Sequence, residues 1–241
     1  MKIKILYEDS NIFAIDKPSG ISVHPDGRTK EKTITDWVLK NYPRMKNVGE
    51  PQFFEDKGKK IEIKRPGVVH RLDRDTSGVL ILAKNQKTYE FLKNLFQNRE
   101  IKKTYHAIVS GNIKDERGVI NKPIGRSPTD FRKYSANRGA RGEMREAITR
   151  YKVLHRFSVG LNRLTYLEVY PKTGRTHQIR VHMKAIDHPV VCDSLYNEKS
   201  VCPKGLKRMA LHAKSIEFTD QKGKVLKIES PLPKEFEKML K

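Results

Sequence analysis

Segments in which apolar and polar residues alternate, or in which branched apolar residues run together, predict β-strands along most of the chain. The run "GVLILAK" (78–84) is continuous and apolar, which is typical of a strand buried on both faces. The other predicted strands are "KILYED" (4–9), "IFAIDKP" (12–18), "KKTYHAIVSG" (102–111), "RLTYLEVYPKTG" (163–174) and a hairpin over 209–230 that turns near "DQKGK".

Apolar residues at helical spacing predict fewer and shorter helices. In "NQKTYEFLKNLFQNRE" (85–100) this spacing places Tyr89, Leu92, Leu95 and Phe96 on one face, which we expect to pack on the sheet. Further helices are expected over 33–43, capped by Thr33 or Thr35, over 175–186 and over 233–241. Strands outnumber helices, so the prediction is an α+β fold with a mixed, mostly antiparallel sheet flanked by helices and loops.

Two segments show neither pattern. Residues 44–66 are polar with several glycines and prolines, and they are predicted to be a basic surface insertion with a strand at 61–64. Residues 126–145 are rich in turn residues and predict a mobile basic loop. Its cations are Arg126, Arg132, Lys133, Arg138, Arg141 and Arg145. No repeat or Ser/Gly linker interrupts the chain, so 1–241 is predicted to be a single domain.

The net charge of the chain gives information about its binding partner. The 241 residues carry a formal charge of +22 and a pI near 9.9, far more than solubility requires. A polyanion is therefore expected, either nucleic acid or an anionic membrane surface. No apolar run approaches the roughly 18 residues of a membrane span. The N-terminus does not resemble a signal peptide, so the expected location is the cytoplasm.

Cofactor and metal motifs are not found in the sequence. Cys192 and Cys202 fit a reducing compartment, and their spacing matches no zinc or redox motif. His177 and His182 are five residues apart, whereas a four-residue spacing would place two metal ligands on one helix face. No dinucleotide fingerprint, P-loop or nucleophile elbow occurs. We therefore expect no cofactor and no metal, which leaves a carboxylate enzyme or a plain binding protein.

The stretch "HRLDRDTSG" (70–78) places charged residues between two apolar runs. It could be a solvated turn with internal Arg–Asp pairs, or it could hold a carboxylate in a cleft with arginines that keep it ionised. Asp73 and Asp75 are two residues apart, so an extended strand would point both side chains the same way. A turn must therefore separate them if only one is to face the cleft. Asp75 beside Thr76 suits a turn residue that accepts hydrogen bonds, which leaves Asp73 to face the cleft.

A second candidate segment is "TGRTHQIRVH" (173–182). Gly174 allows a turn, and a helix that opens here would present backbone donors and Arg175 to an anion. Arg180 lies five residues further along, so the two arginines point in different directions. One of them could meet phosphate while the other faces the cleft, and a plain solvated arginine is the alternative.

Several segments together resemble the RluA-type pseudouridine synthases. "VVHRLDRDTSGVLILAK" resembles their active-site segment, and "IFAIDKPSGISVHP" resembles their N-terminal KPxG segment. "KKTYHAIVSG" and "KTGRTHQIRVHM" are similar to the segments that contribute a tyrosine and a buried arginine, while "DHPVVCDSLY" and "MALHA" resemble structural stretches. The segments come in the family's order and cover roughly residues 5–230.

The resemblance implies a fold, an activity and a site. It implies the pseudouridine synthase catalytic fold with a central RNA-binding cleft. Asp73 would be catalytic, Tyr105 would meet the target base, and Arg180 would hold Asp73 as an anion. RNA contacts are expected from Arg71, Lys103, Arg126, Arg175, His177 and Gln178. The expected partner is ribosomal or transfer RNA, with no membrane and no obligate protein partner, and the chain is expected to act as a monomer.

The sequence departs from the family pattern at few places. Cys192 stands where a glycine is usual, and the insertion at 44–66 is not part of the core pattern. The chain begins at the catalytic segment, so a separate N-terminal S4 domain is not expected. The main alternative is a non-catalytic RNA-binding or ribosome-associated protein that keeps the fold. The presence of Asp73, Tyr105 and Arg180 together favours the enzyme, and a metal-dependent nuclease lacks ligands.

Overall fold

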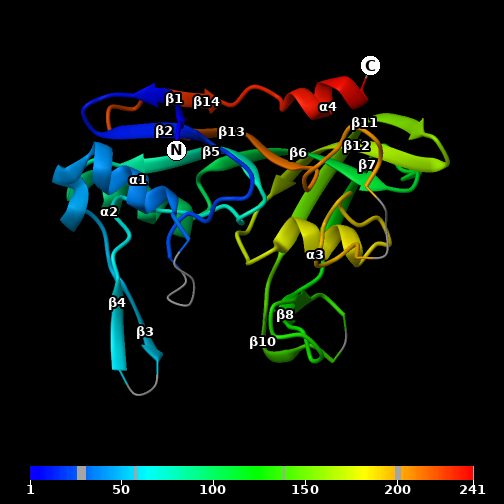
Figure 1. The fold of residues 1–241 in the computed structure, drawn as a ribbon, viewed down its shortest axis with the longest axis horizontal. Helices are drawn as coiled ribbons and strands as arrows, with labels where there is room; N and C mark the ends of the chain where they lie inside the picture. The colour runs from blue at the N-terminus through cyan, green and yellow to red at the C-terminus, as the bar shows by residue number, and fades with distance from the viewer. Residues whose placement is uncertain (26–30, 57–58, 138, 199–201, 241) are drawn as a thin grey trace. The chain divides into compact units, whose positions relative to one another are not determined.

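The structure is a computed structural model that describes residues 1–25, 31–56, 59–137, 139–198 and 202–240. The chain forms two compact units (Figure 1). Unit 1 comprises Met1–Ile101 and Ser215–Ser230, and unit 2 comprises Lys102–Lys214 and Pro231–Lys241. Strand β13 (Leu211–Thr219) carries the chain from unit 2 back into unit 1.

Unit 1 is built on antiparallel strands. Strand β2 pairs with β1 on one side and with β5 on the other, and β14 pairs with the unit 1 part of β13. The register of β2 with β5 places Phe13 opposite Leu82, and both side chains are fully buried. The elements of unit 1 are β1 (Lys4–Glu8), β2 (Ile12–Lys17), α1 (Ile34–Asn41), a 3-10 helix (Pro43–Asn47), β3 (Gln52–Asp56), β4 (Lys59–Ile63), β5 (Ser77–Ala83), α2 (Gln86–Gln97) and β14 (Val225–Glu229).

The two helices of unit 1 begin at residues whose side chains cap them. Thr33 and Asp36 form a capping box at the start of α1, as one of the two predicted caps requires. Asn85 accepts a hydrogen bond from the Thr88 amide at the start of α2. Leu92 of α2 belongs to the same buried cluster as Ile81 of β5. This packing confirms the predicted amphipathic helix over 85–100 and its contact with the sheet.

Unit 2 is also an antiparallel sheet, with the strand order β6-β12-β11-β7. Its core cluster contains Leu167 of β12, Met183 of α3 and Phe236 of α4, all fully buried. The elements of unit 2 are β6 (Lys102–Ser110), β7 (Arg117–Asn121), β8 (Ile124–Arg126), β9 (Tyr134–Ser135), β10 (Arg141–Arg145), β11 (Ile148–Val159), β12 (Asn162–Pro171), α3 (Gln178–Lys184) and α4 (Lys234–Met239). Strands and helices thus form the expected α+β fold, and the strand pairs named above for the two units are antiparallel.

The segment 126–145, which the sequence predicts as a mobile basic loop, contains short strands. Strands β8, β9 and β10 form a small three-stranded sheet in the order β10-β8-β9, which lies away from the larger strands of unit 2 (Figure 1). We call it the basic sheet. Its apolar anchors are Ile124 at 3% exposure and Tyr134, which packs beside Val181 of α3 and Tyr196. Arg138, one of the predicted cations, lies outside the described residues.

Two other predictions are corrected in detail. The insertion at 44–66 contains a 3-10 helix and a hairpin of β3 and β4 instead of one strand. The hairpin reaches away from the sheet of unit 1 (Figure 1). The helix predicted over 175–186 is shorter, because His177 adopts a left-handed conformation (φ 56°) and α3 starts only at Gln178.

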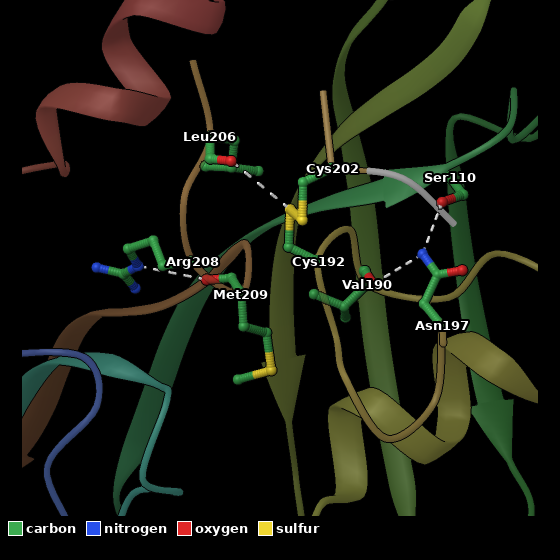
Figure 2. The surroundings of a disulfide bond; sticks show 8 residues. All are labelled: Ser110, Val190, Cys192, Asn197, Cys202, Leu206, Arg208 and Met209. Atoms are coloured by element: carbon green, nitrogen blue, oxygen red, sulfur yellow. Dashed lines mark hydrogen bonds between the residues drawn. A yellow bond between two sulfur atoms is a disulfide. The ribbon is translucent and has the colours of Figure 1, made fainter. Parts of the chain in front are cut away.

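The two cysteines are paired, although the sequence was interpreted as favouring free thiols. A disulfide joins Cys192 to Cys202, and Figure 2 shows it beside Leu206 and Met209. Cys192 has a φ of 58°, a left-handed conformation that favours glycine. A glycine, which the family resemblance implies at this position, would adopt this conformation without strain. Neither the spacing of the cysteines nor a local motif predicts the bond.

Reducing this disulfide is expected to lower the stability of the purified protein. A bond that closes a loop of 10 residues restricts the unfolded chain and is worth about 3 kcal/mol. Chemical denaturation with and without dithiothreitol measures the difference, and Cys202→Ser serves as the control that should not respond to the reductant. Equal stability of the wild type in both conditions, with two titratable thiols, would show that the bond does not form.

None of the helices in the described part of the chain is long and apolar enough to cross a membrane.

Candidate active site

The loop that carries Asp73 lies in unit 1 between an isolated bridge and β5. Val68 forms a single antiparallel bridge to Leu82, so the chain enters and leaves the loop side by side. The amide of Thr76 donates a hydrogen bond to the Asp73 carbonyl, at 3.2 Å, and closes a turn between the two predicted aspartates. Leu72 is buried, while the Asp73 and Asp75 side chains are half-buried. The loop therefore presents Asp73 next to a buried anchor.

The KPSG segment (17–20), which begins at the last residue of β2, holds the backbone of this loop. Lys17 is fully buried, and its Nζ atom donates to the carbonyl oxygens of Arg74 at 2.9 Å, Pro18 at 2.8 Å and Ile21 at 2.7 Å. The Gly20 amide also donates to the Arg74 carbonyl, at 2.9 Å. A loop that is clamped by a buried ammonium group loses much of its conformational freedom, which favours one orientation of its side chains.

Ser19 also holds the backbone of the loop, and the contacts of Asp75 differ from those predicted. Ser19 Oγ donates to the Asp75 carbonyl at 2.7 Å. The Asp75 carboxylate itself makes no hydrogen bond to any described residue, so the prediction that it shapes the turn through its side chain is wrong. The residue acts here through its backbone. Arg71 is exposed, and its Nη1 atom lies 3.4 Å from His24 Nε2. Arg74 forms a surface ion pair with Glu31, with 3.2 Å between Nη2 and Oε1.

His70, the first residue of the charged stretch, has a structural position. Its Nε2 atom accepts a hydrogen bond from the Ile81 amide at 3.0 Å, and its ring stacks on Phe96 with a centroid distance of 4.6 Å. Because an acceptor nitrogen carries no proton, the ring proton of the neutral side chain is on Nδ1. His70 thus fixes the entry to the loop against β5 and α2.

Tyr105 and Arg180, to which the family resemblance also gives roles, lie in unit 2. Tyr105 lies on β6 opposite Val169 of β12, and its half-buried ring packs against the core of unit 2. Its neighbour Lys103 donates from Nζ to the Thr173 carbonyl at 3.1 Å. Arg180 lies on α3 and is 4% exposed, so the expectation of a buried arginine is confirmed.

Gln178 braces the start of α3, and its side chain is buried, whereas the sequence predicts an RNA contact there. Its side chain is 5% exposed. Its Oε1 atom accepts from Thr173 Oγ1 at 2.7 Å and from the Arg175 amide at 3.0 Å. Its Nε2 atom donates to the Ile148 carbonyl and to Thr149 Oγ1, both at 3.0 Å. The expected anion site at this turn is weakened, because the Arg175 amide already has an acceptor.

The remaining predicted RNA contacts in unit 2 differ in exposure. Arg126 is exposed on β8, and its guanidinium lies 5.1 Å from the ring centroid of Tyr134. Arg175 is half-buried and donates from Nε to the Glu146 carbonyl at 3.0 Å. His177 is half-buried, with its Nδ1 atom 2.9 Å from the Tyr196 hydroxyl.

His182, the second histidine of this segment, is fully buried and structural. Burial lowers its pKa below the ordinary value. In the neutral ring Nε2 donates to the Lys122 carbonyl at 2.9 Å, which leaves Nδ1 to accept from Thr149 Oγ1 at 2.8 Å. Within the described ranges no group of three or more His, Cys, Asp or Glu side chains could hold a metal ion.

The sequence analysis did not single out two buried residues, Lys17 and Asp193. Lys17 follows Phe13 and Ile15 at alternate positions of β2, and all three are fully buried, so the alternation of the strand could have predicted a buried lysine. Asp193 is buried beside Arg180, thirteen residues away along the chain, and no local pattern connects the two. The stretch that contains Asp193 was interpreted only as structural.

Comparison with known proteins decides the family. The sequence profile of the RNA pseudouridylate synthases matches residues 11–185. The chain belongs to the RNA pseudouridylate synthase family. The match includes the loop of Asp73, the strand of Tyr105 and the helix of Arg180, and it agrees with the RluA-type resemblance.

Individual relatives support the same family. An uncharacterized RNA pseudouridine synthase of Synechocystis is 34% identical over 99% of this chain and 68% of its own length. The ribosomal large subunit pseudouridine synthase D of Borreliella burgdorferi is 38% identical over 97% of this chain and 66% of its own length. The structure of human RNA pseudouridylate synthase domain containing 4 has a TM-score of 0.73 at 26% identity, covering 98% of this chain and 91% of that one.

The chain is shorter than these curated relatives. It spans 57% of an Aquifex aeolicus relative and 64% of the Nitrosomonas europaea synthase D.

Proposed function

We propose that this protein is an RNA pseudouridine synthase, which isomerises specific uridines of structured RNA to pseudouridine. The reaction breaks the N1–C1′ bond, turns the uracil and joins C5 to C1′. Atoms and oxidation state are conserved, so the chemistry calls for no redox cofactor and no ATP. The observation that carries the proposal is the clamped loop of unit 1, in which Lys17 and Gly20 hold the Arg74 carbonyl next to Asp73.

Three side chains are assigned to the reaction. Asp73 is the catalytic carboxylate, as the HRLD segment of this family implies. An ionised carboxylate that is partly shielded from water can act as a nucleophile or as a base. Tyr105 offers a ring face to the uracil that has left its stack, and such stacking is worth about 1–3 kcal/mol. Arg180 keeps the anion of Asp73 favourable by its charge. The assignment of the three residues to one site is part of the proposal.

RNA is the proposed partner because the protein carries exposed positive charge. Arg126 and Arg141 of the basic sheet are exposed, as are Arg71 and Arg74 of the Asp73 loop. A base must leave its stack before the uracil can turn, which costs a few kcal/mol and favours loops or single-stranded segments. Because relatives are named ribosomal large subunit pseudouridine synthase D, large-subunit ribosomal RNA is the first substrate to test and transfer RNA is the second.

The proposal extends to the organisation and location of the protein. The two units work together as a single catalytic domain over residues 1–241. The protein acts as a monomer in the cytoplasm without an obligate protein partner. The charge of +22 supports the choice of an RNA ligand.

The test uses the hydrogen on C5, which is lost when C5 bonds to C1′. Purified protein is incubated with large-subunit ribosomal RNA fragments and with transfer RNA, each tritiated at C5 of uridine. Release of tritium to water is expected from at least one RNA, and carbodiimide probing then maps the modified position. Tight RNA binding without release of tritium from total cellular RNA would instead support a non-catalytic RNA-binding protein.

A further inference from the structure

The guanidinium of Arg180 is held by a buried carboxylate within unit 2. Arg180 Nε donates to Asp193 Oδ2 at 2.7 Å, and Nη2 donates to Oδ1 at 2.8 Å. The side chains are 4% and 0% exposed. Two parallel N–H···O bonds fix the plane of a guanidinium as well as its position. These two bonds therefore restrict the orientation of the Arg180 guanidinium.

Asp193 can fix Arg180 because Asp193 is itself held. Its Oδ1 atom also accepts hydrogen bonds from the backbone amides of Leu195 at 2.9 Å and Tyr196 at 3.1 Å. Its own amide donates to the Val190 carbonyl at 3.3 Å. A carboxylate that accepts this many hydrogen bonds has little rotational freedom. The turn at 193–196 is thus a rigid support that reaches back to α3.

Tyr196 holds the guanidinium from a second direction. The Arg180 guanidinium carbon lies 5.0 Å from the centroid of the Tyr196 ring, a distance at which a cation is attracted to an aromatic ring. The Tyr196 hydroxyl accepts from the Tyr134 amide at 2.9 Å and lies 2.9 Å from His177 Nδ1. Asp193 thus bonds the edge of the guanidinium, while Tyr196 interacts with it through the ring.

We propose that Asp193 is a positioning residue for pseudouridine formation and that it acts through Arg180. The proposal rests on the proposed function, in which Arg180 supports the anion of Asp73. The Arg180–Asp193 pair carries no net charge, so Asp193 adds orientation to Arg180 and adds no positive charge. A reacting group must be held to within about 0.5 Å of its productive position, and a misplacement of about 1 Å can reduce the rate 10²-fold.

Asp193→Asn tests the proposal with a nearly isosteric change. The asparagine oxygen can still accept from the amides of Leu195 and Tyr196, but its NH2 group then faces Arg180 Nε, so two donors meet. We expect kcat in the tritium-release assay to fall about 100-fold. The KM for RNA should change less than about threefold, because the pair is buried. Asp187→Asn, an exposed position of left-handed conformation (φ 61°) that also suits asparagine, is the matched control and should leave kcat unchanged.

A double-variant comparison separates action through Arg180 from an independent effect. Arg180→Met removes the group that Asp193 is proposed to orient. If Asp193 acts through Arg180, the double variant Arg180→Met/Asp193→Asn will have the kcat of Arg180→Met within about threefold, since residues that act as a unit are not additive. A further loss near 100-fold in the double variant would overturn the proposal, and so would a wild-type kcat for Asp193→Asn alone.

Arg180→Lys gives a result that does not depend on the folding of Asp193→Asn. Lysine keeps the charge beside Asp193 but cannot form two parallel bonds to a carboxylate. Its kcat is expected to fall to the level of Asp193→Asn, and a wild-type kcat would mean that charge alone suffices and would refute the orientation argument. Thermal melting of each variant shows that it is folded. A wild type that releases no tritium from any RNA would reject the proposed function, which is a different outcome from an active wild type with an equally active Asp193→Asn.

Discussion

Asp73→Asn is expected to abolish pseudouridine formation while leaving the protein folded and able to bind RNA. Asparagine has nearly the same shape, and the turn around it is held through backbone atoms, with the Thr76 amide on the Asp73 carbonyl and Lys17 on the Arg74 carbonyl. The amide lacks the negative charge that a nucleophile or base requires. Tritium release should fall by a factor on the order of 10⁴ or more, the size seen when a central catalytic group is removed.

Asp75→Asn is the matched control for this experiment. Asp75 is two residues away in the same loop and is half-buried like Asp73. Its carboxylate bonds to no residue within the described part of the chain, so the change should alter the rate by less than about threefold. Circular dichroism and RNA affinity are measured for both variants. Full activity in Asp73→Asn, together with loss of activity in Asp75→Asn, would show that Asp75 and not Asp73 is the catalytic aspartate.

The elements with strong local patterns were predictable from the sequence because each is stabilised by its own residues. All seven residues of β5 are buried, and an unbroken apolar run indicates this directly. Helix α2 combines a capping asparagine, Asn85, with apolar residues at helical spacing. The residues alone marked "HRLDRDTSG" and "TGRTHQIRVH" as candidate segments, and the family resemblance then implied the roles of Asp73 and Arg180.

The missed features depend on contacts between residues that are far apart in the sequence. Strand β9 has two residues, Tyr134 and Ser135, too few for a periodic pattern, and it is held by Tyr196, which lies 62 residues away. The Arg180–Asp193 pair and the bond between Cys192 and Cys202 likewise join different segments. No propensity or motif encodes such contacts, so only the folded chain reveals them.

The net charge of +22 predicts that RNA binding weakens steeply with salt. Each phosphate neutralised on single-stranded RNA contributes about −0.7 to the slope of log K against log salt. With about six contacts, the affinity should fall about 300-fold between 50 and 200 mM salt. Binding measured by fluorescence anisotropy over this range tests the prediction. A flat dependence would mean that the positive charge does not serve RNA binding.

The basic sheet should carry part of this slope, and its ion pairs show which cations are available. Arg132 is paired with Asp130 at 2.8 Å and Arg145 with Glu143 at 3.0 Å. Arg126 and Arg141 are exposed and have no carboxylate partner among the residues that the structure describes. Paired cations contribute less to phosphate binding, because their charge is already compensated locally. The free energy of RNA binding should therefore depend more strongly on the two unpaired arginines.

Neutralising both unpaired arginines tests this argument. Arg126→Gln/Arg141→Gln should reduce the magnitude of the salt slope by about 1.4, because two phosphate contacts are lost. The control is Lys93→Gln on α2, whose charge is already compensated by Glu50 at 2.5 Å, and it should leave the slope nearly unchanged. Equal slopes for the double variant and the control would show that the basic sheet does not contact RNA. Because the sheet carries Tyr134, whose amide bonds to the Tyr196 hydroxyl, RNA held there would lie on the same structural support that orients Arg180.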